Sequence, residues 1–204
     1  MASSPVAAER PQLSYALVVD TARAHIAERG VEALSLRRVA AELGVTAPAL
    51  YGYVADRRAL IHAVAERELE GWLTRFAMVT GSGFEPKVRE LVKVYVDYAV
   101  EHPRLFEIVF QRPPRLEFVP ATGHESHNAT DAFHYLANDI SISIEAGTLR
   151  ADLDAETVLF SMWATAHGLA SIFLLGLETD ARQRDRLVET TVDILLAGLR
   201  PSTT

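Results

Sequence analysis

Apolar residues recur along most of the chain at the three- and four-residue spacing of a helix that buries one face. In the first predicted helix, from about Ser14 to Arg29, they share one face, and Gly30 follows where the helix would end. No stretch shows the sustained alternation of apolar and polar residues that is typical of a half-buried strand. The pattern therefore predicts an all-α protein with about nine helices.

Capping and turn residues divide the N-terminal part of the chain into short helices. Ser35 is the expected N-cap of a second helix that Gly44 ends, and Thr46 is the expected N-cap of a third helix of under three turns. Asp56 precedes a long fourth helix that reaches about Met78. Two short helices joined by a glycine turn form a helix-turn-helix, whose second helix can lie in the major groove of DNA.

The later segments have the same helical spacing and are separated by breaks that contain glycine or proline. The stretch TGSGFEP, residues 80–86, is the expected connector between two domains. Further helices are expected over residues 86–101, 103–110, 125–146, 152–175 and 180–199. The predicted organisation is a disordered arm over 1–12, a helix-turn-helix domain over 13–60, the fourth helix as a link, and a second domain over 80–204.

The composition places the chain in the globular class. Its 204 residues are 49% hydrophobic and 23% charged. The absence of cysteine excludes disulfides, thiolate metal sites and cysteine nucleophiles. The N-terminal residues lack the basic and apolar regions of a signal peptide, and the longest apolar tract is too short for a hydrocarbon core of roughly 30 Å. A cytoplasmic protein without a membrane partner is therefore expected.

The formal net charge of −7 argues at first against a nucleic-acid partner, but the charge is uneven. Between Arg10 and Leu60, seven arginines face five acidic residues, which gives +2 and leaves −9 for the rest of the chain. This asymmetry is expected if only the first quarter of the chain meets a polyanion. Chance scatter of surface charge remains the alternative.

The stretch LRRVAAELGVTAPALYGYVADRRAL, residues 36–60, has a nearly uncharged face between two pairs of arginines. Small residues on the predicted third helix would let its backbone approach base edges, and Tyr51 and Tyr53 could reach phosphates. Arginines on either side would contact phosphates. A surface helical hairpin without a ligand is the alternative interpretation.

This stretch, preceded by A-R-A-H-I-A-E-R-G and L-S, closely resembles the DNA-binding domain of the tetracycline-repressor (TetR) family of bacterial regulators over about the first 65 residues. The resemblance implies a homodimeric repressor with an N-terminal DNA-binding domain and a C-terminal helical domain for ligand binding and dimerisation. An effector would release it from a palindromic, double-stranded operator. W-A-T-A-H-G, residues 163–168, is also similar to the Trp/His-Gly (WHG) signature of one subgroup of ligand domains.

The resemblance implies DNA-binding roles for eight residues. Arg37 occupies a position that reads guanine in some members, Tyr51 one that meets the DNA backbone, and Arg57 that of a phosphate-binding lysine. The remaining positions are Thr46, Ala47, Pro48, Gly52 and Tyr53. Gly52 and Tyr53 depart from the residues that are common in the family, so no operator sequence is transferred.

Aromatic residues recur on the predicted middle helices and favour an apolar pocket for a small aromatic or apolar effector. Aromatic residues at helical spacing also occur in ordinary cores, so both interpretations stay open. His167 follows Trp163 by one turn and is either a polar anchor in that pocket or a core histidine. The candidate ligand-binding residues are Tyr95, Tyr98, Phe106, Phe110, Phe133, Trp163 and His167.

The last two predicted helices carry stripes that are typical of an oligomer interface. The first stripe consists of Ser161, Ala164, Gly168 and Ile172, and the second of Val188, Val192, Leu195 and Leu199. Packing within one chain is the alternative. A two-fold dimer would place its recognition helices about 34 to 36 Å apart, one turn of DNA.

No metal, cofactor or catalytic site is expected. His124, His127, Asp131 and His134 share one helix face with zinc- or nickel-ligand types, but a solvated polar helix start has the same pattern. The chain lacks a Gly-x-Ser-x-Gly elbow, a phosphate loop and a dinucleotide fingerprint. The alternative function is a helical protein that binds or converts a small molecule and keeps a degenerate helix-turn-helix, and a DNA-compacting or adaptor protein is a third interpretation.

Overall fold

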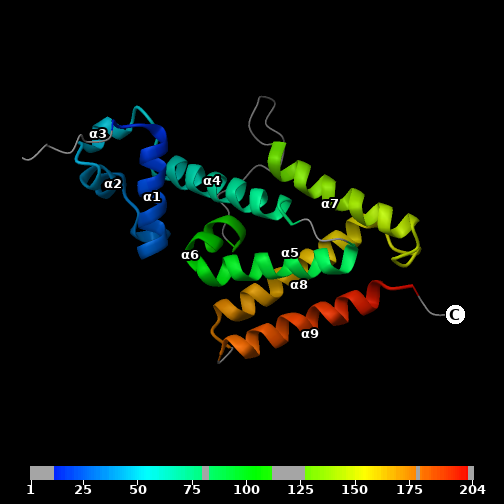
Figure 1. Cartoon of the computed structure of the whole chain (residues 1–204). Coiled ribbons are helices and arrows are strands. Elements are labelled where there is room, and N and C mark those ends of the chain that lie inside the picture. The colour runs from blue at the N-terminus through cyan, green and yellow to red at the C-terminus, as the bar shows by residue number, and fades with distance from the viewer. Residues whose placement is uncertain (1–11, 80–82, 112–126, 178–179, 202–204) are drawn as a thin grey trace, which may run out of the picture. The chain divides into compact units, whose positions relative to one another are not determined.

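The computed structural model describes residues 12–79, 83–111, 127–177 and 180–201, with the side chains of 127–133 excepted. Figure 1 shows these ranges as helices joined by turns. They contain nine α-helices, α1 to α9, and two further helical segments, η1 and η2, and no strand occurs within them. The all-α prediction is confirmed.

The chain divides into two compact units between Val64 and Ala65, inside helix α4 (Arg57–Ala77). The C-terminal part of α4 belongs to the second unit because Trp72 and Leu73 are buried in that unit's core. The helix that the sequence predicts as a link therefore contributes residues to both units. Residues 80–82 of the predicted connector, and all but the last residue of the predicted N-terminal arm, lie outside the described residues.

The first unit contains α1 (Tyr15–Arg29), η1 (Val31–Ala33), α2 (Leu36–Glu42) and α3 (Ala47–Leu50), followed by the start of α4. Gly44, with φ of +68°, makes the turn between α2 and α3, a backbone conformation that favours glycine. The side chain of Ser14 accepts from the Leu17 N–H over 3.2 Å, and that of Ser35 accepts from the Arg38 N–H over 3.3 Å. The buried core consists of Val18, Val19, Ala22, Ile26, Leu34, Val39, Ala40, Leu50, Val54, Leu60, Ala63 and Val64.

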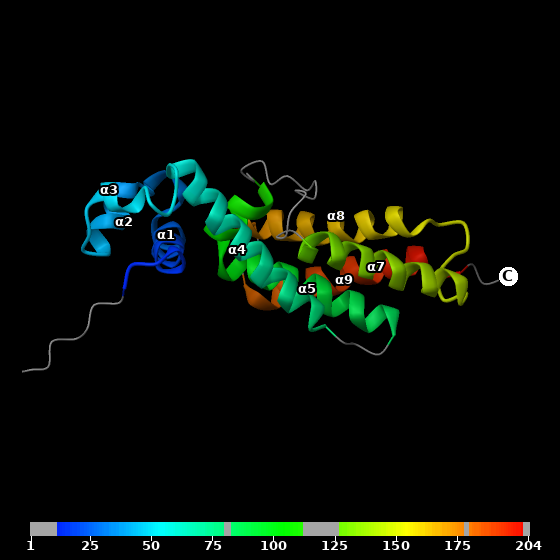
Figure 2. The ribbon, with the colours of Figure 1, turned by 90° about the horizontal axis from the view of Figure 1, so that it is seen from above.

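The second unit contains the rest of α4 and five further α-helices. These are α5 (Phe84–Glu101), α6 (Pro103–Phe106), α7 (His127–Glu145), α8 (Ala155–Leu174) and α9 (Ala181–Leu199), with the π-helical turn η2 (Glu107–Gln111) after α6. Helices α5, α8 and α9 lie side by side in both views (Figures 1 and 2). Helix α7 packs against α8.

Helix α8 is long and apolar enough to cross a membrane when judged by length and composition alone. It packs against α5, α7 and α9, however, and supplies seven buried residues to the unit. These buried residues account for part of the apolar composition of α8. The rest comes from apolar residues on its exposed face, among them Phe160 and Ile172.

A buried hydrogen bond joins α4 to α5 within the second unit. The Tyr98 hydroxyl donates to Oε2 of Glu68 over 2.7 Å. Glu68 is 8% exposed, so its carboxylate has lost most of its contact with water. The bond therefore offsets part of the desolvation penalty of this carboxylate.

We expect Tyr98→Phe to lower the free energy of unfolding by about 1 to 3 kcal/mol, because the change removes a donor from a buried carboxylate. Urea unfolding measures this difference. Tyr51→Phe is the matched control, since Tyr51 is exposed, and it should change stability by less than about 0.5 kcal/mol. Equal effects of the two substitutions would contradict a stabilising role for the Tyr98 hydroxyl.

Candidate nucleic-acid interface and effector cavity

The predicted DNA-binding segment forms one continuous surface of the first unit, from the N-cap of α3 through the turn that follows it. Thr46 and Pro48 are exposed, Ala47 is half-buried, and Tyr51 is 60% exposed. The side chain of Thr46 makes no capping hydrogen bond in the described structure, so its hydroxyl is available to another partner. Helix α3 has four residues, about one turn, which agrees with the prediction of a helix of under three turns.

The turn after α3 accounts for that short length. Helix α3 ends at Leu50 with Tyr51 as its C-cap, and residues 51–53 form a turn that contains Gly52, a residue that costs about 1 kcal/mol relative to alanine inside a helix. The Tyr53 hydroxyl donates to the Leu13 carbonyl over 3.0 Å, which joins this turn to the residue before the N-cap of α1. Tyr53 is thus engaged within the unit, whereas the hydroxyl of Tyr51 has no partner among the described residues.

The arginines that flank this surface differ in their partners. Arg37 on α2 is exposed and has no hydrogen bond or ion pair within the described ranges. Its planar guanidinium can therefore meet a guanine edge with two parallel hydrogen bonds. Arg58 is likewise exposed, and the described part of the chain offers it no partner.

Arg57 makes contacts that the sequence did not indicate. Its Nε donates to the Leu34 carbonyl over 2.9 Å and its Nη2 to the Val31 carbonyl over 2.7 Å. Oε2 of Glu32 lies 3.6 Å from the same Nη2. Arg57 therefore connects the first turn of α4 to η1 through hydrogen bonds. Only its remaining N–H groups can donate to a phosphate.

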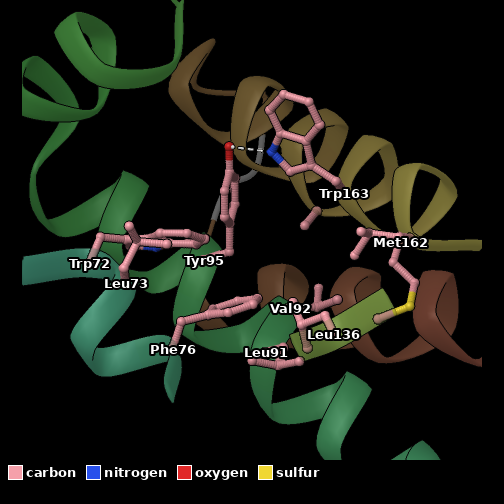
Figure 3. Close-up of a pocket in the computed structure, with 11 residues that line it drawn as sticks. Trp72, Leu73, Phe76, Leu91, Val92, Tyr95, Leu136, Met162 and Trp163 are labelled. Carbon is pink, nitrogen blue, oxygen red and sulfur yellow. Dashed lines mark hydrogen bonds between the residues drawn. The ribbon is translucent and has the colours of Figure 1, made fainter. Parts of the chain in front are cut away.

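The second unit contains an apolar cavity of about 40 Å³ (Figure 3). Helices α4, α5, α7 and α8 supply its wall, and no charged residue lines it. The lining residues are Trp72, Leu73, Phe76, Leu91, Val92, Tyr95, Leu136, Leu159, Met162, Trp163 and Ala166. The sequence predicted Tyr95 and Trp163 among them but missed the wall that α4 provides, although Trp72 and Phe76 are one helical turn apart.

Tyr95 is the polar centre of this region. Its hydroxyl accepts from Nε1 of Trp163 over 3.3 Å and lies 2.9 Å from Nδ1 of His167. Figure 3 shows this hydroxyl directed at the indole N–H of Trp163. Burial raises the pKa of Tyr95 and lowers the pKa of His167, so both side chains are neutral at pH 7. A neutral His167 with its proton on Nε2 accepts the Tyr95 O–H at Nδ1.

Three other predicted ligand residues lie behind the cavity wall. Phe106 packs on His167 with ring centroids 5.8 Å apart, and Phe110 packs on Tyr95 with centroids 5.2 Å apart. With His167, they support the lining residues without lining the cavity themselves. Tyr98 is bonded to Glu68 and also lies outside the lining.

The position of Phe133 falls in α7, but its side chain lies outside the described residues. The same holds for two members of the histidine-rich face, His127 and Asp131, and His124 is outside the described ranges altogether. His134 is exposed. Within the described part of the chain, no three potential metal ligands come together.

The predicted interface stripes differ in their exposure. On α8, Ala164, Gly168 and Ile172 are exposed and Ser161 is half-buried. On α9, the predicted stripe faces the chain's own core: Val192 and Leu199 are buried there, while Val188 and Leu195 pack against it. The exposed large apolar residues of α9 are Leu187 and Ile194, on another face of the helix.

Two family models match the chain. The model described as "Tetracyclin repressor-like, C-terminal domain" matches residues 88–195, more than half of the chain. The model described as "Bacterial regulatory proteins, tetR family" matches residues 18–64, which end where the first unit ends.

Individual proteins are similar to this chain in sequence or in structure. The HTH-type transcriptional regulator SAB2452 of Staphylococcus aureus is 32% identical over 74 residues, which span 36% of this chain and 39% of that relative. A protein with unknown function from Rhodococcus sp. RHA1 has a similar structure, with a TM-score of 0.73, 24% identity, and coverage of 94% of this chain and 99% of that one. The transcriptional regulator FadR from Bacillus subtilis, in complex with stearoyl-CoA, has a similar structure with a TM-score of 0.67 and 13% identity. The match covers 92% of this chain and 100% of that one.

We expect Arg57→Ala to lower the free energy of unfolding by about 1 kcal/mol even without DNA, because two carbonyls lose their charged donor. Thermal unfolding measures this loss. Arg58→Ala removes the same charge from the neighbouring residue without breaking a described hydrogen bond, and should leave stability unchanged within about 0.5 kcal/mol. A stable Arg57→Ala protein would show that the guanidinium contributes little to the fold.

Proposed function

Because the chain belongs to the tetracycline-repressor (TetR) family, we propose that it is a ligand-responsive transcriptional regulator that represses its target genes. The first unit binds a palindromic DNA operator, and the second binds a small apolar or aromatic effector that releases the protein. One observation carries this proposal: helix α4 begins in the unit with the DNA-binding surface and ends in the wall of the cavity. As a DNA-binding regulator, the protein is placed in the cytoplasm.

The nearly uncharged surface of α3 supports DNA binding. Thr46, Ala47 and Pro48 are small enough to let the backbone approach base edges, and the Tyr51 hydroxyl can meet a phosphate. Arg37 supplies base recognition, and the remaining donors of Arg57 supply a phosphate contact. Gly52 and Tyr53, which are both exposed, complete this surface. The acidic charge of the second unit is compatible with DNA binding because salt screens charges beyond about 8 Å.

The cavity supports an apolar effector. It is lined only by apolar and aromatic residues, and the fold is shared with a regulator bound to stearoyl-CoA. At about 40 Å³ the cavity is smaller than the roughly 150 Å³ that accommodate benzene in a protein core. An effector therefore has to widen the wall, and three of the residues that line it, Trp72, Leu73 and Phe76, belong to α4.

This widening supplies the link to DNA. Displacement of Trp72 moves α4, whose first turn belongs to the DNA-binding unit. A palindromic operator has a fixed spacing between its half-sites, so a shift of the recognition helices costs contacts. A coupling free energy of about 1 to 3 kcal/mol per site, present twice in a dimer, is enough to release the operator.

The protein acts as a homodimer in this proposal. Ala164, Gly168 and Ile172 on α8 form an exposed small and apolar face. On α9 we assign the contact to Leu187 and Ile194, because the stripe that contains Val192 faces the chain's own core. We also assign the chain to the Trp/His-Gly subgroup, because Trp163 and His167 of that segment both contact Tyr95.

We expect Arg37→Ala to weaken operator binding by about 1 to 3 kcal/mol and to relax the preference at one base pair per half-site. The measurement is binding to the genomic fragment that the purified protein retains, compared with a random duplex at the same salt concentration. Arg58→Ala is the control and should weaken both DNAs similarly. An equal loss on both DNAs for Arg37→Ala would show that Arg37 reads no base.

We expect compounds that raise the melting temperature of the protein to weaken operator binding. A ligand that binds more tightly to the conformation released from DNA reduces the population of the conformation that binds the operator. Trp163→Ala should lose this response while operator affinity stays within about tenfold. Ile142→Ala, an exposed position on α7 outside the cavity, should keep the response. If every stabilising compound leaves DNA affinity unchanged, its site is not coupled to the operator.

A further inference from the structure

Three of the residues that line the cavity carry a side-chain N–H or O–H group: Trp72, Tyr95 and Trp163. Two of these groups are satisfied, since the Trp163 N–H donates to the Tyr95 hydroxyl and that hydroxyl pairs with His167. The indole N–H of Trp72 is buried and has no hydrogen-bond partner in the described structure. The wall of the cavity therefore has one donor left unused.

An unused buried donor is uncommon. In folded proteins, about nine in ten buried polar groups or more are hydrogen-bonded. Trp72 is 6% exposed, and its ring is fixed by stacking on Phe76 and by edge contacts with Tyr95 and Phe110. Aromatic packing on three sides therefore holds the indole in the wall, with its N–H buried and unpaired.

The residues around this donor define what can pair with it. None of the lining residues is charged, so an ionised ligand group would enter without a counter-charge and at a large desolvation penalty. A hydrocarbon would fill the cavity but leave the N–H unpaired. A neutral oxygen acceptor on an apolar body avoids both penalties.

On the basis of the proposed function, we propose that the effector is a compact, neutral, apolar molecule with one hydrogen-bond acceptor, such as a ketone, ester or ether oxygen, which binds the Trp72 N–H. This proposal requires that the widening of the wall, which any ligand of this cavity needs, also brings the buried Trp72 N–H into contact with the ligand. Met162 opposite is unbranched and flexible, so it can move aside. The acceptor thereby bonds to a residue of α4 itself.

Three probes built on the same indane ring system test the inference: 1-indanone carries a carbonyl, indane carries no acceptor, and indane-2-carboxylate carries a charge. Their dissociation constants are measured by calorimetry on the full-length protein. We expect the ratio of the indane constant to the 1-indanone constant to fall about tenfold in Trp72→Phe, because only the ketone loses a hydrogen bond. The carboxylate should bind at least about tenfold more weakly than 1-indanone.

Trp163→Phe is the matched control, because its N–H is already bonded to Tyr95. In that variant the ratio should stay within about twofold of the native value. The ratio removes effects of cavity volume and of changed stability, since both probes share them.

Nitrogen-15 NMR of the native protein gives an independent measurement. The chain has two tryptophans, so two indole signals are expected, and the one that remains in Trp163→Phe belongs to Trp72. We expect 1-indanone to move the Trp72 indole proton downfield, as a new hydrogen bond does, and indane to leave it without such a shift.

The inference is overturned if the ratio is unchanged in Trp72→Phe, if the Trp72 proton fails to move downfield with bound ketone, or if 1-indanone does not bind up to its solubility limit. These outcomes are independent of DNA. If the probes behave as expected while 1-indanone leaves operator affinity unchanged, the ligand class stands and the proposed regulatory function fails.

Discussion

The burial of Tyr95 is the constraint on which the second unit depends. Its ring meets Trp72 and Phe106 edge-on, each with centroids 5.5 Å apart, so its hydroxyl must find its partners inside the protein. Those partners are Trp163 and His167, which lie one turn apart on α8. The hydrogen bonds of a single hydroxyl thus fix α5 and α8 against each other at the point where the cavity forms.

Helix α4 makes contacts in both units of the chain. At its first turn, Arg57 donates to the carbonyls of Val31 and Leu34 and so belongs to the helix-turn-helix unit. Further along, Trp72 is packed among the aromatic residues around Tyr95. The same helix therefore has to fit the neighbours of both units, and this restricts which of its residues can change independently.

The sequence predicted the helices well because the signals that begin and end a helix are local. A capping serine or aspartate, or the turn at Gly44, acts within a few residues of its own position. Periodicity identifies a buried face but not what covers it. Tyr95 and Tyr98 therefore looked equivalent in the sequence, although only Tyr95 lines the cavity. In the same way, the spacing of Val192 and Leu199 indicated a contact with a partner subunit, whereas both residues are buried in the core of their own chain.

The small size of the cavity bears on how such a regulator can respond. A cavity already wide enough for its ligand would bind it without moving the wall. A ligand with equal affinity for two conformations does not change the equilibrium between them. A cavity that must widen makes binding and displacement of α4 the same event. In such an arrangement, an acceptor that bonds to Trp72 only when the cavity is widened stabilises the widened state and not the narrow one. A hydrogen bond that contributes modestly to the affinity for the ligand then contributes in full to the free-energy difference between the two states.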